Sequence, residues 1–308
     1  MAGEQWPDPL VLERRRERQM DRRDALKTMG LLGASTLLGD SAAAEERASD
    51  AEFFGVLVDT TRCAGCRNCE FVCAETNGLP DPPDDDSVLE QERKPSVTQW
   101  SVVNRYETDR GEVFVKRQCM HCNHPACASA CLTKAMLKTG RGPVIWRESK
   151  CMGCRFCMIS CPFDIPKFEY NSPVPKIQKC RMCWERLAEG EQPACVEECP
   201  EEALTFGPRR ELLDIARRRI YKSPDRYLNH IYGEHETGGT GWLYLAAVSF
   251  EQLGFRADLG TEPYPELTKN FLYSVPVVFA LMPLFLLGVS GATKRADESE
   301  GIPDEHHG

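Results

Sequence analysis

The sequence contains 308 residues, of which 42% are hydrophobic and 28% are charged, and it carries a net charge of −9. This composition is sufficient for a packed core and excludes wholesale disorder. The negative charge argues against nucleic-acid binding, because that interaction depends on basic side chains that neutralise phosphates. Sixteen cysteines stand against only six histidines, so the chemistry of the protein depends on what its thiols hold.

The first 44 residues have the features of an export signal in the expected order. An arginine pair at 22–23 precedes an apolar stretch at 28–38, and three alanines at 42–44 provide small residues for cleavage. The apolar stretch is shorter than the roughly 20 residues that a transmembrane helix needs. The arginine pair resembles the twin-arginine motif, with Ala25 where an aromatic residue is usual. We therefore predict a twin-arginine-type signal peptide at residues 1–44, in preference to an amphipathic helix with a basic face.

The sixteen cysteines fall into four groups of four, with none left over. Groups one and three share the spacing C-x2-C-x2-C-x3-C, whereas groups two and four are C-x2-C-x4-C-x3-C and C-x2-C-x11-C-x3-C. In group order the members are Cys63, Cys66, Cys69 and Cys73; Cys119, Cys122, Cys127 and Cys131; Cys151, Cys154, Cys157 and Cys161; and Cys180, Cys183, Cys195 and Cys199. Four complete quartets indicate that these cysteines act together rather than singly.

Three uses of these quartets compete. Disulfides suit an exported protein, but thiols two residues apart form strained, reducible bridges. Zinc binds four-cysteine sites in general, and group four alone resembles a zinc ribbon. The repeated C-x2-C-x2-C-x3-C run is instead the bacterial ferredoxin pattern, in which three thiolates hold one [4Fe–4S] cluster and the fourth reaches a second. We therefore predict iron–sulfur clusters, with zinc and disulfides as the alternatives.

An internal repeat supports this interpretation. Residues 56–62, before group one, match residues 144–150, before group three, which lie 88 residues later. Inside the two loops, Gly65 corresponds to Gly153 and Arg67 to Arg155. Each unit has the pattern of a short apolar strand that runs into a cysteine loop. The chain is therefore predicted to contain two duplicated two-cluster units.

Charged and polar side chains near the cysteines have ordinary explanations. His121 and His124 lie within group two and could tune a cluster or ligate iron, but that group already has four thiols, so we expect both outside the ligand set. Lys176 and Lys179 precede group four and could offset cluster charge, although solvated lysines are the commoner case. The sequence has no Walker A loop, G-x-G-x-x-G fingerprint or serine-hydrolase elbow, so no catalytic residue is assigned.

After group four, the sequence has no further cysteines. Residues 209–219 fit an amphipathic helix, with Leu212 and Leu213 on its apolar face. The glycine pair at 238–239 predicts a tight turn before the apolar run at 242–248.

A long apolar segment lies near the carboxyl end. Residues 271–292 are 22 residues without a charge, which is long enough to cross a hydrocarbon core of about 30 Å. The two basic residues that follow obey the positive-inside bias if the preceding domain is exported. We predict a transmembrane anchor at 269–293, rather than the buried helix of a soluble domain, and an acidic cytoplasmic tail at 294–308.

The whole pattern resembles a known family, the four-cluster, ferredoxin-like electron-transfer subunits of membrane-bound respiratory oxidoreductases. The nearest likeness is to the hydrogenase-2-type subunit, with the subunits of formate dehydrogenase and other molybdopterin enzymes also similar. The motifs that carry the resemblance are Gln118-Cys-Met-His-Cys122, Gly153-Cys-Arg-Phe-Cys-Met-Ile-Ser-Cys-Pro-Phe163, Pro166-Lys-Phe-Glu-Tyr-Asn171 and Tyr232-Gly-Glu-His-Glu-Thr-Gly-Gly-Thr240. Leu132 follows Cys131 where proline is usual, a departure that removes no ligand.

The resemblance implies a nested ligation that spacing alone does not give. The alternative is an adjacent scheme, which joins group one with two and group three with four. In the nested scheme the ligand sets are set 1 (Cys63, Cys66, Cys69, Cys199), set 2 (Cys73, Cys180, Cys183, Cys195), set 3 (Cys119, Cys122, Cys127, Cys161) and set 4 (Cys131, Cys151, Cys154, Cys157). The expected fold is α+β, with two nested two-cluster ferredoxin-like units, four clusters in a line and one C-terminal transmembrane helix.

The resemblance also implies a function without bond chemistry. Electrons would enter from a catalytic subunit, pass through four [4Fe–4S] clusters and leave toward a quinone-reactive membrane partner. A [NiFe] hydrogenase is the expected catalytic partner, a molybdopterin enzyme is the alternative, and a zinc- or disulfide-stabilised anchored scaffold is the second alternative. We expect a cluster domain at 52–208 and a trailing helix and loop segment at 209–268, both on the periplasmic side of the inner membrane.

Overall fold

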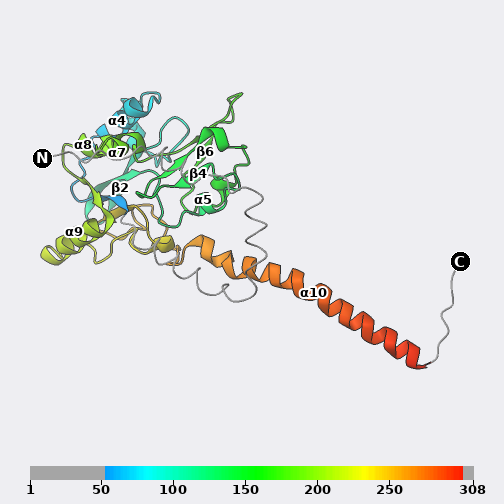
Figure 1. The fold of residues 1–308 in the computed structure, drawn as a ribbon. Coiled ribbons are helices and arrows are strands. Elements are labelled where there is room, and N and C mark those ends of the chain that lie inside the picture. Colours follow the sequence, from blue (N-terminus) through cyan, green and yellow to red (C-terminus); the bar gives the residue numbers. More distant parts are fainter. Residues whose placement is uncertain (1–52, 301–308) are drawn as a thin grey trace, which may run out of the picture.

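The computed structural model describes residues 53–300, so the predicted signal peptide and residues 301–308 of the predicted tail lie outside it. The described chain is mixed α/β and ends in one long helix, α10 (Tyr264–Glu300), which extends away from the remainder (Figure 1).

A three-stranded sheet forms the centre. Strand β1 (Phe54–Asp59) lies between antiparallel β8 (Leu204–Pro208) and parallel β9 (Trp242–Leu245). The apolar side chains of β1 are buried without alternation, which is the pattern of a strand covered on both faces. Strand β9 belongs to the segment after group four, so that segment completes the sheet next to the first cysteine loop.

The two faces of this sheet have different covers. Helix α9 (Arg209–Lys222) packs Leu212 and Leu213 against Leu57 and Leu243, which confirms the amphipathic helix predicted there. On the other face, Val56, Val58 and Trp242 pack against the cysteine-bearing loops. The sheet therefore separates an ordinary helical layer from the layer that contains the thiols.

Three antiparallel hairpins extend this second layer, and they consist of β2 (Val102–Thr108) with β3 (Gly111–Arg117), β4 (Met136–Lys138) with β5 (Val144–Trp146), and β6 (Lys167–Phe168) with β7 (Ile177–Gln178). Strands β1 and β5 lead into the loops of groups one and three, which confirms the predicted strand-to-loop repeat.

Short helices follow the cysteine loops. They are α4 (Asn68–Asn77), α5 (Ala126–Ser129), α6 (Phe156–Ile159), α7 (Trp184–Ala188) and α8 (Ala194–Glu197). The described part of the chain also has the 3-10 turns η1 (Asp86–Leu89), η2 (Glu148–Lys150) and η3 (Glu236–Gly238). Apart from α4, each of these five helices has only four or five residues, so the thiols are positioned mainly by loops.

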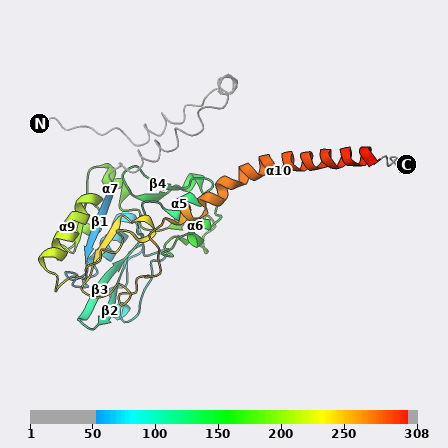
Figure 2. The ribbon, with the colours of Figure 1, turned by 90° about the horizontal axis from the view of Figure 1, so that it is seen from below.

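Helix α10 is long and apolar enough over Tyr264–Gly291 to cross a membrane by length and composition, and its apolar side chains there are exposed. Pro276 and Pro283 both lie inside the helix. Its first turns lie against α5, and α10 leaves the domain beside α5 and α6 (Figure 2).

Candidate iron–sulfur sites

The sixteen cysteines are free thiols, and the fold brings them together across the sequence groups. Cys73 of group one lines the same cavity as three thiols of group four, Cys180, Cys183 and Cys195. Conversely, Cys199 of group four lines a cavity with the first three thiols of group one. These associations are sets 1 and 2 of the nested scheme.

The inner groups exchange their last thiols in the same way. Cys131 lines a cavity with Cys151, Cys154 and Cys157, and those thiols are the charges that act on Cys157. Burial raises the pKa of Cys122, and among the neighbouring thiolates Cys161, followed by Cys119, adds most to that rise. The thiols thus gather as in sets 3 and 4, while their ligation of clusters stays a prediction.

The loops of groups one and three repeat one backbone conformation. Gly65 and Gly153 have φ of 74° and 73°, and the arginines two residues later, Arg67 and Arg155, have φ of 59° and 61°. Left-handed residues interrupt an extended or helical path and allow successive N–H groups to point into one concavity, as in anion-binding nests. The same loop conformation therefore places three thiols and inward N–H groups around each site.

Burial controls the protonation of these thiols. It raises the pKa of Cys122 to about 12 and that of Cys180 to about 11, with neighbouring thiolates adding to the effect in Cys122. At Cys131 burial also acts upward, but hydrogen bonds, including one from Met136 N at 3.4 Å, lower the pKa overall. Most of these thiols therefore need a bound cation before they ionise, which is the normal coupling of metal binding to proton release.

The four sets form a continuous row through shared apolar walls. Sets 1 and 2 meet in the core cluster that contains Cys69, Cys195 and Cys199, which also reaches Cys122 of set 3. Sets 2 and 3 meet around Trp100 and Ile165, in a cluster that contains Cys73, Cys119, Cys161 and Cys180. Sets 3 and 4 meet around Met136, Val144 and Ile177, in a cluster that contains Cys127, Cys131, Cys151 and Cys157. Each set therefore borders the next.

Buried lysines lie within this row. Lys179 is 2% exposed; its Nζ donates to the carbonyls of Val144 and Cys180 and lies 3.8 Å from Cys119 Sγ. The prediction of a solvated lysine is therefore wrong at this position, because the fold closes over the residue that precedes group four. Lys116, at the end of β3, is buried as well, and no motif in the sequence pointed to it.

His121 is also completely buried. Its Nδ1 accepts a hydrogen bond from Val144 N at 2.9 Å, which anchors the group-two loop to β5. Burial, reinforced by nearby lysines, lowers its pKa well below the usual value, so the imidazole is neutral.

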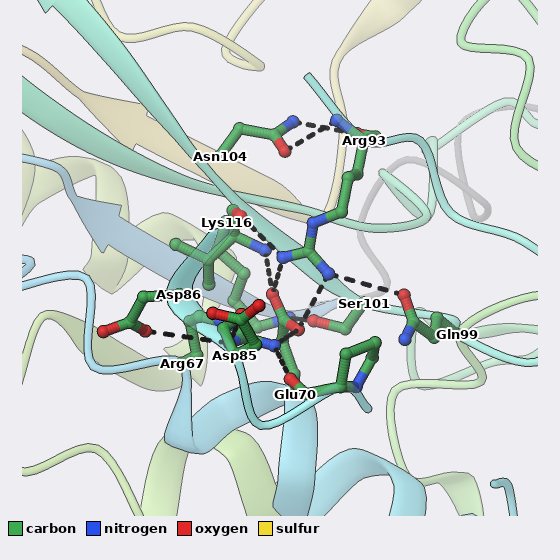
Figure 3. Close-up of polar contacts among 11 residues, drawn as sticks. Arg67, Glu70, Asp85, Asp86, Arg93, Gln99, Ser101, Asn104 and Lys116 are labelled. Carbon is green, nitrogen blue, oxygen red and sulfur yellow. Dashed lines mark hydrogen bonds and ion pairs between the residues drawn. The ribbon is translucent and has the colours of Figure 1, made fainter. Parts of the chain in front are cut away.

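A charged network holds the first cysteine loop against β2 (Figure 3). The buried Glu70 carboxylate accepts hydrogen bonds from Arg67, Arg93 and the backbone N–H of Val103, at 3.3, 2.5 and 2.5 Å. Arg67 also donates to the carbonyls of Asp85 and Pro83. The network fixes the positions of Cys66 and Cys69 through their immediate neighbours in the chain.

The donor sets fit iron–sulfur clusters. Four thiols surround a common cavity in sets 1, 2 and 4, and backbone N–H groups, such as Met182 N at 3.3 Å from Cys180 Sγ, point at the sulfurs. Within residues 53–300, no three Cys, His, Asp or Glu side chains converge on a position for a single metal ion. Four thiols with backbone N–H groups directed at their sulfurs are the donors that a [4Fe–4S] cluster takes.

Comparisons with known proteins agree with this chemistry. The model of the 4Fe-4S dicluster domain matches residues 111–209. The chain is 33% identical over 329 residues to the Hydrogenase-2 operon protein HybA of Escherichia coli O157:H7, which covers 94% of this chain and 98% of that protein. It is 46% identical over 290 residues to a protein of Nitratidesulfovibrio vulgaris, covering 91% of this chain and 78% of that one.

A third relative matches over a smaller part of the chain. The iron-sulfur subunit of the nitrate-inducible formate dehydrogenase of Escherichia coli K12 is 32% identical over 197 residues, which is 61% of this chain and 66% of that subunit. Together the fold and the matches define a ferredoxin-like iron–sulfur protein of the electron-transfer class. The chain belongs to the family of oxidoreductase iron–sulfur subunits that includes the hydrogenase-2 protein HybA.

Proposed function

We propose that this protein is a non-catalytic subunit that relays electrons through four [4Fe–4S] clusters, between a periplasmic [NiFe] hydrogenase subunit and a quinone-reactive membrane partner. The observation that carries this proposal is the row of four thiol sets, in which each set borders the next. Iron–sulfur clusters supply reversible one-electron chemistry when bound. The chain contributes the thiols, the apolar walls and the buried cations that surround them.

The hydrogenase assignment is supported by coverage. The similarity to HybA extends over 94% of the chain, whereas that to the formate dehydrogenase subunit covers 61%. A molybdopterin enzyme is therefore the second catalytic partner to test.

The two ends of the row suit different partners. Around set 4 the chain exposes six large apolar side chains: Leu132, Met152, Phe156, Ile159, Tyr170 and Val174. We call these six the apolar patch; Leu132 and Ile159 are 87% and 82% exposed. Two of its residues, Phe156 and Ile159, belong to α6, and the candidate membrane helix begins beside α5 and α6 (Figure 2). We therefore assign the membrane partner to set 4 and the catalytic subunit to set 1.

This arrangement requires α10 to be the membrane anchor and the domain to face the periplasm after twin-arginine export. The uncharged segment of α10 and the basic residues that follow it support this orientation. Protease protection in intact spheroplasts tests it, because the domain should be cleaved from outside while the tail is protected.

Metal analysis of the native complex, extracted in mild detergent without oxygen, tests the proposal as a whole. Four clusters require about 16 irons per chain. Nickel in the same complex would support the hydrogenase, whereas molybdenum or tungsten without nickel would replace it with a molybdopterin enzyme. A colourless chain that contains zinc and no iron would overturn the electron-transfer function.

The variant Cys73→Ser distinguishes the nested from the adjacent ligation. In the nested scheme, iron falls to about 12 per chain, and Cys180, Cys183 and Cys195 become open to alkylation. In the adjacent scheme, the newly reactive thiols would be those of group two. Cys161→Ser is the matched control, since it should expose set 3 and leave group four protected.

A further inference from the structure

Lys116 lies at the junction of two thiol sets. Its side chain lines both the cavity of set 1 and the cavity of set 2, and the residue is only 3% exposed. The Nζ donates hydrogen bonds to Ser101 Oγ at 2.5 Å and to Gln118 Oε1 at 3.2 Å. It also lies 4.8 Å from the centre of the Trp242 ring, so its other side faces aromatic carbon.

The hydrogen-bond partners of this ammonium group, Ser101 and Gln118, are both neutral side chains. The acidic residue of the neighbouring network, Glu70, is already bonded to Arg67 and Arg93 (Figure 3). An uncompensated buried charge costs several kcal/mol in proteins, by order of magnitude, so Lys116 needs negative charge from elsewhere.

The thiolates of sets 1 and 2 would supply that charge once they hold clusters. Lys116 borders the cavity that the four thiols of set 1 line and also the cavity that the four thiols of set 2 line. Its ammonium group therefore lies beside both sets at once.

We propose that Lys116 is a counter-charge shared by sets 1 and 2, and that it raises the reduction potentials of the two clusters together. The inference rests on the proposed function. One-electron reduction adds one negative charge to an iron–sulfur cluster, and a fixed cation beside it favours the reduced form. Because the same cation faces both sets, an electron that passes from one to the other leaves and enters a similar field. Lys116 thus keeps the difference between the reduction potentials of the two clusters small.

Lys179 provides a natural contrast. Its Nζ lies beside Cys119 Sγ of set 3 and also acts on Cys127 and Cys161 of that set. The two lysines are both buried, yet they face different sets. Their removal should therefore move different potentials.

The test is a redox titration of the intact complex, followed by electron paramagnetic resonance, with iron measured in every sample. In Lys116→Met, we expect the equilibrium constants for reducing two clusters to fall at least tenfold, or about 59 mV for a one-electron couple. Lys179→Met should shift a different cluster, and Lys116→Arg should leave the potentials close to those of the wild type. Lys222→Met removes an exposed, solvent-screened charge and should shift none.

Three outcomes would overturn the inference. They are unchanged potentials in Lys116→Met with full iron content, a shift of only one potential, and an equal shift in Lys116→Arg. If Lys116→Met and Lys116→Gln both lose iron while Lys116→Arg retains it, the charge is needed even to hold the clusters, which supports the inference. Loss of iron from all three variants would show that the size and shape of the lysine side chain matter rather than its charge, and would overturn the inference. A wild-type complex without iron would instead refute the proposed function.

Discussion

The first and third cysteine loops have the same spacing and almost the same backbone, yet they lie in opposite surroundings. Around group one, Arg67 is buried and bonded to Glu70, and the following helix α4 has ten residues. Around group three, Arg155 is exposed and lies over the rings of Phe168 and Tyr170, at 5.4 and 5.5 Å. The helix after it, α6, has only four residues.

This difference indicates which features a duplicated cluster loop must keep. Both copies retain the left-handed glycine and arginine, because these set the path of the chain past three thiols. The residues between and after the cysteines are free to change. In the loop of group one, these residues join the loop to β2 through a buried carboxylate. In the loop of group three, they form part of the apolar patch.

The largest expected effect comes from breaking the charge network of the first loop. Glu70→Gln leaves Arg67 and Arg93 without their buried carboxylate, which should lower the free energy of unfolding by about 3–5 kcal/mol. Urea titration of the anaerobically purified protein, followed by loss of cluster absorbance and of circular dichroism, measures the change. Glu148→Gln is the control beside the third loop, because its half-exposed ion pair with Lys176 is worth about 0–1 kcal/mol. Equal losses would contradict the contrast between the two loops.

A smaller difference is expected at the matched glycines. A Cβ at position 65 would lie 2.5 Å from the Phe114 ring, whereas at position 153 the nearest atom outside the loop is 3.9 Å away, on Phe168. Both positions have positive φ, so alanine costs about 1–2 kcal/mol in either loop. Gly65→Ala should cost about 1–3 kcal/mol more, because it also overpacks the site.

The urea midpoints of the two alanine variants check this order. A Gly153→Ala midpoint as low as that of Gly65→Ala would mean that backbone strain, and not the surroundings, dominates both loops.

Much of the fold around the thiols could be predicted from the sequence because its signals are local. The cysteine spacing repeats, the apolar strand before each loop repeats, and α9 has a clear helical periodicity. Such patterns need only neighbouring residues. The fold class and the iron–sulfur chemistry follow from them.

The charges inside the domain could not be predicted, because their partners are distant in the chain. Glu70 follows a cysteine in the first turn of α4, where a carboxylate is ordinarily solvated; its partners Arg93 and Val103 lie 23 and 33 residues away. Lys116 lies where β3 passes from the surface into the space between two sets, so the alternation of side chains along the strand does not predict that this lysine is buried. The prediction that Lys179 is solvated was wrong for the same reason.

The apolar patch gives the smallest expected change in stability and the most direct test of the set-4 end. Ile159→Glu changes an 82% exposed side chain, so the free energy of unfolding should stay within about 0.5 kcal/mol. If the patch contacts the membrane partner, the loss of a buried isoleucine at that contact corresponds to about 1.5–3 kcal/mol, or more than tenfold in affinity. Recovery of the partner with the tagged chain, over a series of detergent concentrations, measures this.

Tyr221→Glu is the matched control for that experiment, since Tyr221 is an 88% exposed aromatic on α9, on the other side of the sheet from the cysteine loops. It should leave recovery of the membrane partner unchanged. If Tyr221→Glu releases the partner and Ile159→Glu does not, the partner binds the α9 layer, and the apolar surroundings of the third loop serve another contact. If neither variant releases it, α10 alone holds the partner, and the divergence between the two loops concerns the first loop only.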